Sequence, residues 1–130
     1  MKIPEKIKKN SWEKFEFSEI ADLSKKKINP QTEKENIKCI ELEHIEKETG
    51  RQLGNVFSKE QLSTKNVFYK NDVLFGKLRP NLRKYIHCKH DGVCSSEIWV
   101  LRSKKGINSK FLFYLVQTER FIKAACVTSG

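Results

Sequence analysis

The longest helical pattern in the chain lies near its C-terminus, in residues 110–125, KFLFYLVQTERFIKAA. Asn108 or Ser109 precedes it, and either side chain can accept a hydrogen bond from a backbone N–H of the first turn. Helical spacing predicts one buried apolar face made of Phe111, Leu112, Leu115, Val116 and Ile122. A helix with a single apolar face needs other elements to cover that face, so the rest of the chain must supply them.

Most other apolar residues occur in short alternating runs, and this spacing predicts β-strands. The last two predicted strands are expected to form a hairpin with Asp91-Gly92 at its tip. Pro80 ends the strand before them, because proline has no N–H for a sheet. The predicted strands cover residues 12–17, 37–45, 73–78, 83–88 and 93–102.

Short helical turns and loops complete the predicted secondary structure. Ser18 can cap a turn over residues 18–23, and Ser58 can cap another over residues 57–63. Residues 24–36 are polar and contain a proline, so we expect a loop there. Together these elements predict an α+β fold with a mixed, mainly antiparallel sheet, a few short helices and a C-terminal helix.

Length and composition narrow the class of protein. A chain of 130 residues fits one domain, residues 1–130, and can bury a core without disulfides or a metal. Hydrophobic residues are 38% and charged residues 32% of the chain, which excludes a disordered tail. No apolar run approaches the roughly 20 residues that span a bilayer. The first residues, MKIPEKIKKNSW, lack the apolar segment of a secretory signal. We therefore expect a cytoplasmic protein with no membrane partner.

The charge is positive and unevenly distributed. The formal net charge is +10, and residues 61–90 contribute +6 of it through seven basic residues and one acidic residue. The basic residues of this segment alternate with apolar residues, as in a structured surface rather than a basic tail. Such a surface predicts binding to a polyanion. A solvated lysine-rich face is the alternative interpretation.

The four cysteines predict neither disulfides nor a metal site. Cys39 and Cys126 lie in apolar surroundings and are expected to behave as small buried residues. Cys88, His90 and Cys94 lie close together, but their spacing contains no CxxC or HxxxH pair, the usual start of a zinc site. We therefore expect Cys88 and Cys94 to lie in strands on either side of a polar turn.

Motifs of catalysis are scarce. The sequence has no glycine-rich phosphate-binding loop and no HExxH helix. Asp72, Asp91 and Glu97 are the only acidic residues between positions 61 and 118. A small nuclease that binds Mg²⁺ through Asp72 or Glu97 is therefore one alternative function.

One ordered series of motifs resembles a known family. Residues 71–84, NDVLFGKLRPNLRK, are followed by residues 91–97, DGVCSSE, then by the apolar helix and by a turn at Thr128-Ser129-Gly130. Ile3-Pro4, Trp12 and the segment SEIA have counterparts at the start. The series resembles the target recognition domain of a type I restriction–modification specificity subunit, over essentially the whole chain.

The resemblance implies a non-catalytic module that reads one half of a split target in double-stranded DNA. In this family the modification subunits methylate adenine with S-adenosylmethionine, and a motor-nuclease restriction subunit uses ATP and Mg²⁺. The chain itself is then expected to need no cofactor. A full specificity subunit has two such domains separated by long helices, whereas this sequence contains one. A module that mainly binds partner proteins, with residues 111–116 partly exposed, is a further alternative.

The loop 48–55, ETGRQLGN, is the first candidate for reading bases. Arginine, glutamine and asparagine match the hydrogen-bonding edges of guanine and adenine. The loop supplies one of each in Arg51, Gln52 and Asn55. A solvated connection without a binding role is the alternative.

The other candidates lie in the basic segment and in serine-containing turns. Phosphate contacts need cations, and we assign them to Lys77, Arg83 and Lys84. Arg79 is either a DNA contact or a partner of Glu97. The serines either bind DNA or are satisfied within the domain, and Trp12 and Trp99 are expected in the core. The remaining DNA-binding candidates are Asn81, Ser95, Ser96, Thr128 and Ser129.

Overall fold

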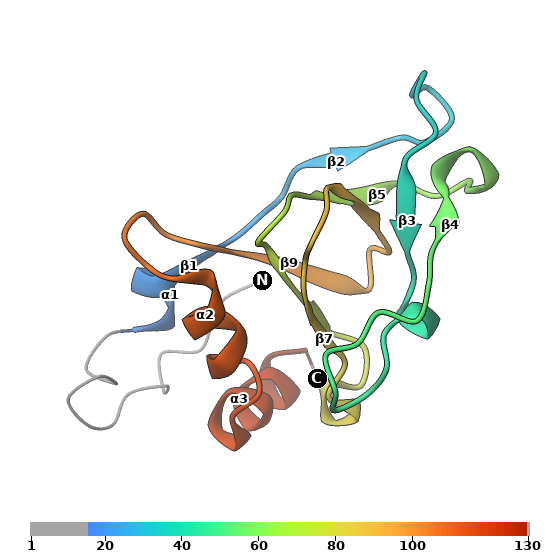
Figure 1. Cartoon of the computed structure of the whole chain (residues 1–130). Coiled ribbons are helices and arrows are strands. Elements are labelled where there is room, and N and C mark those ends of the chain that lie inside the picture. The colour runs from blue at the N-terminus through green and yellow to red at the C-terminus, as the bar shows by residue number, and fades with distance from the viewer. Residues whose placement is uncertain (1–15, 130) are drawn as a thin grey trace.

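The computed structural model describes residues 16–129, which form two β-sheets and a group of helices (Figure 1). The first sheet has the strand order β1-β9-β6-β7, and all of its pairs are antiparallel. Its strands are β1 Ala21–Leu23, β6 Val73–Gly76, β7 Tyr85–His87 and β9 Ile98–Ser103.

The second sheet has the order β2-β5-β8-β3-β4, and β3 and β8 form a parallel pair within it. The predicted α+β class with a mainly antiparallel arrangement is confirmed. Two of the strands, β2 and β5, fall where the sequence analysis expected a loop or assigned no element. The five strands are β2 Lys27–Ile28, β3 Lys38–Ile40, β4 Val56–Phe57, β5 Lys65–Phe68 and β8 Gly92–Cys94.

The helices are short. Figure 1 shows α1, α2 and α3 gathered on one side of β9, away from β2 and β3. Three single 3-10 turns lie between the strands. The helices are α1 Phe17–Ile20, α2 Ser109–Leu115 and α3 Glu119–Ser129, and the 3-10 turns are η1 Leu42–His44, η2 Ser58–Glu60 and η3 Pro80–Leu82.

The predicted single helix over residues 110–125 is wrong, because the chain forms two helices there. The break lies at Thr118, whose hydroxyl donates to the carbonyl of Leu115 (2.7 Å) and accepts from the N–H of Phe121 (3.2 Å). Thr118 thereby caps α3. The predicted cap at Asn108 is confirmed by its hydrogen bond from the N–H of Lys110 (2.8 Å).

The predicted buried face of this region is largely confirmed. Four of its residues are at most 3% exposed, but Phe111 is 37% exposed and does not belong to the core. Phe111 lies in α2 directly before buried Leu112, so the buried face of this short helix is narrower than the predicted one. The four buried residues are Leu112, Leu115, Val116 and Ile122.

The predicted hairpin between residues 83–88 and 93–102 is also wrong. Strand β7 pairs with β6, and β8 pairs with β5 and β3 in the other sheet. The predicted return strand divides at Ser95, whose hydroxyl accepts from the N–H of Glu97 (3.1 Å) while its carbonyl accepts from Ile98 (3.0 Å). A serine side chain that bonds to the local backbone competes with strand pairing. The chain therefore crosses from one sheet to the other at this turn.

Local predictions near the N-terminus need correction too. Phe17 begins α1, so it does not end a strand; residues 12–15 of that predicted strand lie outside the described residues, as does Trp12. The cap of α1 is Glu16 and not Ser18, and Ala21–Leu23 is a strand. The β1 segment pairs with β9, and this long-range pairing overrides the local helical pattern.

Two other predicted elements are shorter or differently capped. The strand that begins near Ile37 ends at Ile40, and the N–H of Glu41 then donates to Nδ1 of His44 (2.9 Å) at the start of η1. Ser58 does not cap η2 but lies inside it. Its buried hydroxyl accepts from the N–H of Ile37 (2.8 Å) and so joins η2 to the start of β3.

The first sheet is the central layer of the fold. One face packs on the helices, where Phe75, Trp99 and Phe121 belong to the same cluster. The other face packs on the second sheet, where Leu74 and Val100 meet Phe68. Trp99 is 5% exposed, so its predicted place in the core is confirmed. Burial on both faces makes β6 and β9 the rigid support for the loops at their ends.

The cysteines are free thiols with unequal access. Burial raises the pKa of Cys39 to about 12 and also raises the pKa of Cys88 and Cys94. Because the thiolate is the reactive form, we expect a thiol reagent at neutral pH to modify the half-buried Cys126 quickly and the other three only after unfolding. Mass spectrometry of the native protein should show one rapid adduct, and Cys126→Ser should show none. Two or more rapid adducts would contradict this assignment.

Candidate nucleic-acid interface

The loop 48–55 uses its polar side chains largely to hold its own shape. Arg51 pairs with Glu46 (2.7 Å), and this contact holds the pKa of Glu46 below its usual range. Gln52 donates to the carbonyl of Gly54 (3.0 Å) and contacts Nε2 of His90 through its carbonyl oxygen (3.2 Å). Of the three predicted base-reading side chains in this loop, only that of Arg51 is exposed, so its guanidinium is the one that a ligand can reach directly.

Asn55 follows the same pattern, since its amide donates to the carbonyl of Val56 (2.9 Å). The fold nevertheless brings this loop beside the basic segment. The N–H of Glu48 donates to the carbonyl of Arg83 (2.7 Å), and Lys47 forms an isolated β-bridge with Lys84. The two segments predicted to bind DNA are therefore neighbours in space, although they are far apart in sequence.

Within the basic segment, two of the predicted phosphate contacts have internal partners. Arg83 forms an ion pair with Glu119 at the start of α3. The ammonium of Lys84 donates to the carbonyl of Leu42 (2.9 Å). Both side chains are half-buried. Any contact with a phosphate has to compete with these bonds.

The side chains of Lys77, Arg79 and Asn81, unlike those of Arg83 and Lys84, have no internal partner in the described region. All three are exposed, and within residues 16–128 no hydrogen bond or ion pair engages these side chains. Arg79 in particular makes no ion pair with Glu97, so the alternative role as its partner is wrong. Three unengaged polar side chains that follow the end of β6 can meet a ligand without breaking an internal bond.

The backbone that presents them is a tight, strained turn. Arg79 has φ +53° and Arg83 has φ +56°, so left-handed residues stand on both sides of η3. For residues other than glycine this conformation costs about 1–3 kcal/mol each, and such strain is concentrated at binding and active sites. The turn is held by buried Pro80 and by the hydrogen bond from the N–H of Leu82 to the carbonyl of Arg79 (2.9 Å).

Ser95 and Ser96, which lie in the predicted strand 93–102, have different environments. Ser95 is buried and satisfied, since its hydroxyl accepts from Glu97 and its N–H donates to the carbonyl of Ile40 (3.0 Å). Ser96 is exposed. The predicted turn at residues 128–130 is wrong for residues 128 and 129, because α3 runs to Ser129 and Thr128 donates to the carbonyl of Ala124 (2.9 Å). The side chain of Ser129 lies outside the described structure.

Ser96 and Lys77 line a groove of about 250 Å³ between the two sheets. The same groove is lined by Lys25 and Lys27, which lie in the predicted polar loop 24–36. The run of three lysines at 25–27 was the one sequence signal for them. Local patterns could not detect the site, because strand pairing of residues 27–28 with β5 is what brings them there. The other polar lining residues are Ser24 and Asn66.

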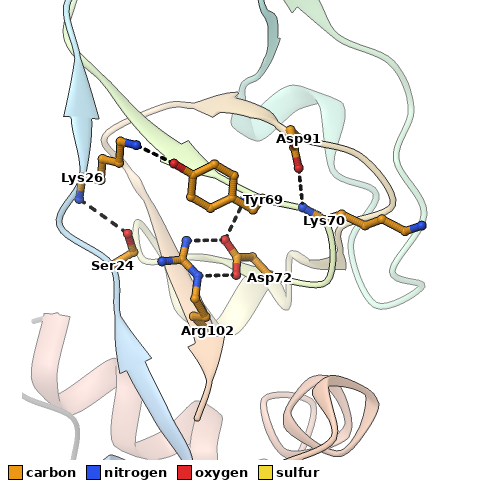
Figure 2. A network of polar contacts seen from close by, with 7 residues as sticks. All are labelled: Ser24, Lys26, Tyr69, Lys70, Asp72, Asp91 and Arg102. Carbon is orange, nitrogen blue, oxygen red and sulfur yellow. Dashed lines mark hydrogen bonds and ion pairs between the residues drawn. The ribbon is translucent and has the colours of Figure 1, made fainter. Parts of the chain in front are cut away.

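A polar network ties the segment before β2 to the ends of β5 and β9 (Figure 2). Asp72 is buried and accepts from Nε (2.8 Å) and Nη2 (2.7 Å) of Arg102 and from the N–H of Tyr69 (2.8 Å). The bonds to Asp72 raise the pKa of Arg102. The guanidinium of Arg102 lies 5.0 Å from the centroid of the Tyr69 ring, and Tyr69 Oη accepts from the ammonium of Lys26 (2.5 Å).

This network removes the support for a metal-dependent nuclease. Both carboxylate oxygens of Asp72 are engaged by Arg102, so they are not available to a cation. Glu97 is exposed, and across the residues with defined placement no group of three histidines, cysteines or acids is arranged to hold a metal. Nothing in the described region favours this alternative.

Comparisons with known proteins give one relative in sequence and solved structures with a similar fold. No protein-family model matches the chain. The type I restriction enzyme EcoDI specificity subunit of Escherichia coli is 31% identical to it over 114 residues, which are 86% of this chain and 25% of that protein. The chain thus spans about a quarter of the length of this curated relative.

Two solved structures share the fold. A chain from work on complex assembly and conformational transition of the type I R-M system has a TM-score of 0.66 and 19% identity, over 75% of this chain and 27% of that one. The HsdS subunit from Thermoanaerobacter tengcongensis has a TM-score of 0.61 and 20% identity, over 69% and 25%. The resemblance inferred from the motifs is therefore confirmed in sequence and in fold. Within residues 16–129, no helix is both long and apolar enough to cross a bilayer.

Proposed function

We propose that this chain, which is similar in sequence and fold to type I restriction enzyme specificity subunits, is a target recognition domain that reads one half of a bipartite DNA sequence. The observation that carries the proposal is the exposed turn with Lys77, Arg79 and Asn81, whose side chains have no internal partner among residues 16–128. The domain does no chemistry itself in this proposal.

The chemistry of this turn suits duplex DNA. A lysine ammonium neutralises a phosphate, an arginine fork matches O6 and N7 of guanine, and an asparagine amide matches adenine. The turn at η3 already fixes the backbone of Arg79 and Asn81, so DNA binding has to order only their side chains. We assign direct contacts to these residues and to Ser96, and place exposed Arg51 at the edge of the same surface.

The remaining candidates support the surface from within. Gln52, Asn55 and Ser95 hold the loop and the crossing turn in shape. Arg83 and Lys84 reach DNA in this proposal only by exchanging their bonds with Glu119 and with the carbonyl of Leu42. The surface is thus narrower than the sequence analysis suggested, and it is centred on residues 77–81.

The proposal includes partners. The modification subunit would supply methylation with S-adenosylmethionine, and the restriction subunit would supply the motor and nuclease that need ATP and Mg²⁺. The chain itself binds none of these cofactors, and it works in the cytoplasm, where its DNA substrate lies. A second recognition domain is needed to read the other half of the target.

Duplex binding that depends steeply on salt tests the proposal. We expect fluorescence anisotropy with a labelled duplex library to give a slope of log K against log[salt] of about −4, as for four or five phosphate contacts. Sequencing of the retained duplexes should recover a single short half-site. The protein-interaction alternative would instead be supported if the protein binds no duplex at low salt but binds an isolated modification subunit in a pull-down without DNA.

A further inference from the structure

We propose that the groove lined by Lys25, Lys27 and Lys77 is a docking site for the sugar–phosphate backbone of duplex DNA, which adjoins the turn at residues 79–81 and shares Lys77 with the reading surface. This inference rests on the proposed function and adds a second set of contacts to it. Three cations from two separate segments meet in a groove of about 250 Å³. That volume is far above the roughly 10–15 Å³ that a single water molecule needs, so a hydrated phosphate group fits.

The segment that carries two of these lysines, residues 24–28, is fixed to both sheets. The N–H of Ser24 donates to the carbonyl of Val100 in the first sheet (2.8 Å). The carbonyl of Lys26 accepts from the N–H of Val67 in the second sheet (2.9 Å), and Lys27 pairs with Asn66. A segment held at both ends presents its side chains in a fixed direction.

The three successive lysines at positions 25–27 make different contacts. Lys26 contacts Tyr69 on one side, as Figure 2 shows, whereas its neighbours Lys25 and Lys27 line the groove. The Tyr69–Arg102–Asp72 network therefore engages Lys26 outside the groove, while its two neighbours line the groove.

The charge in the groove is unbalanced. No aspartate or glutamate lines it, and within the described part of the chain none of its three lysines forms an ion pair. Ser96 adds an exposed hydroxyl at the rim. Like charges held close together favour an anion that bridges them, and the regularly spaced phosphates of a duplex supply such anions.

The test compares two double variants that lose the same charge. Lys25→Ala/Lys27→Ala removes the groove lysines, and Lys34→Ala/Lys105→Ala removes two exposed lysines outside the groove. We expect the groove variant to reduce the magnitude of the salt slope of duplex binding by about 1.8, or 0.9 for each lost phosphate contact. The control variant should change it by much less. Lys25→Arg/Lys27→Arg should keep the slope, because arginine also neutralises phosphate.

Each other outcome has a distinct meaning. If the groove variant and the control reduce the slope equally, the attraction is diffuse and the groove is not a site. If the groove variant binds duplex with the original slope, the groove proposal fails while the proposed function stands. If the unchanged protein binds no duplex, the proposed function fails and this inference fails with it. Thermal unfolding of each variant serves as the control that the fold is retained.

Discussion

Replacing Lys77 and Arg79 together by alanine is expected to lower the affinity for the preferred duplex about 100-fold at 0.15 M salt. Loss of a forked arginine contact to a base costs about 1–3 kcal/mol, and each 1.4 kcal/mol is a factor of about ten in affinity. The lost lysine adds a phosphate contact to this. Anisotropy titrations with the selected half-site duplex measure the change. Both side chains are exposed and lack internal partners in the described region, so the stability of the domain should not change.

Two further variants separate base reading from charge. Arg79→Lys keeps the charge but loses the planar fork, so we expect it to bind random duplex nearly as well while losing its preference for the selected site. Lys34→Ala/Lys105→Ala carries the same loss of charge as the double alanine variant and should bind the selected site with nearly full affinity. An unchanged affinity of Lys77→Ala/Arg79→Ala would exclude this turn as the reading surface.

Arg102→Met is expected to lower the free energy of unfolding by about 3 kcal/mol, the largest effect on stability that we predict for a single site. The substitution leaves Asp72, whose side chain is 3% exposed, as a buried carboxylate without its cation. The effect lies at the lower end of the usual range of about 3–5 kcal/mol, because Arg102 itself is 40% exposed and screened by water. Urea denaturation followed by tryptophan fluorescence measures it.

The double variant Asp72→Asn/Arg102→Met is the control for this pair. Removing both charges leaves no unpaired ion in the interior, so we expect the double variant to be more stable than Arg102→Met alone. The asparagine can still accept the hydrogen bond that Asp72 receives from the N–H of Tyr69. If the losses of the two single variants simply add, the bond between Asp72 and Arg102 is not what stabilises this region.

Local patterns predicted the elements that depend on near neighbours. The cap at Asn108, the buried positions Leu112 and Leu115, and the strand that begins at Val73 all follow from residues within one or two turns. The predicted hairpin failed because the partner of each strand lies elsewhere in the chain. Ser95 turns the backbone by a local bond, but only the pairing of β9 with β6 and β1 shows where the chain goes next.

The candidate site likewise combines residues that the sequence identified with contacts that depend on the folded structure. The sequence identified Lys77, Arg79 and Asn81 as candidates, but it ranked Arg51, Gln52 and Asn55 above them. The ranking changed because hydrogen bonds inside the loop engage Gln52 and Asn55, and these bonds depend on loop geometry. Lys25 and Lys27 were missed because no local pattern reveals that residues 24–28 join two sheets.

The class of fold, the basic character of residues 61–90 and the resemblance to a specificity subunit follow from the amino-acid sequence, because they depend on composition, short-range spacing and ordered motifs. Which cations are available to a ligand follows from the folded domain. Arg83 is paired with Glu119 and Lys84 with the carbonyl of Leu42, whereas Lys25, Lys27 and Lys77 meet in one groove. Whether a charged side chain faces a partner or solvent depends on contacts between residues that are distant in sequence. The spacing of charges along the chain does not reveal these contacts.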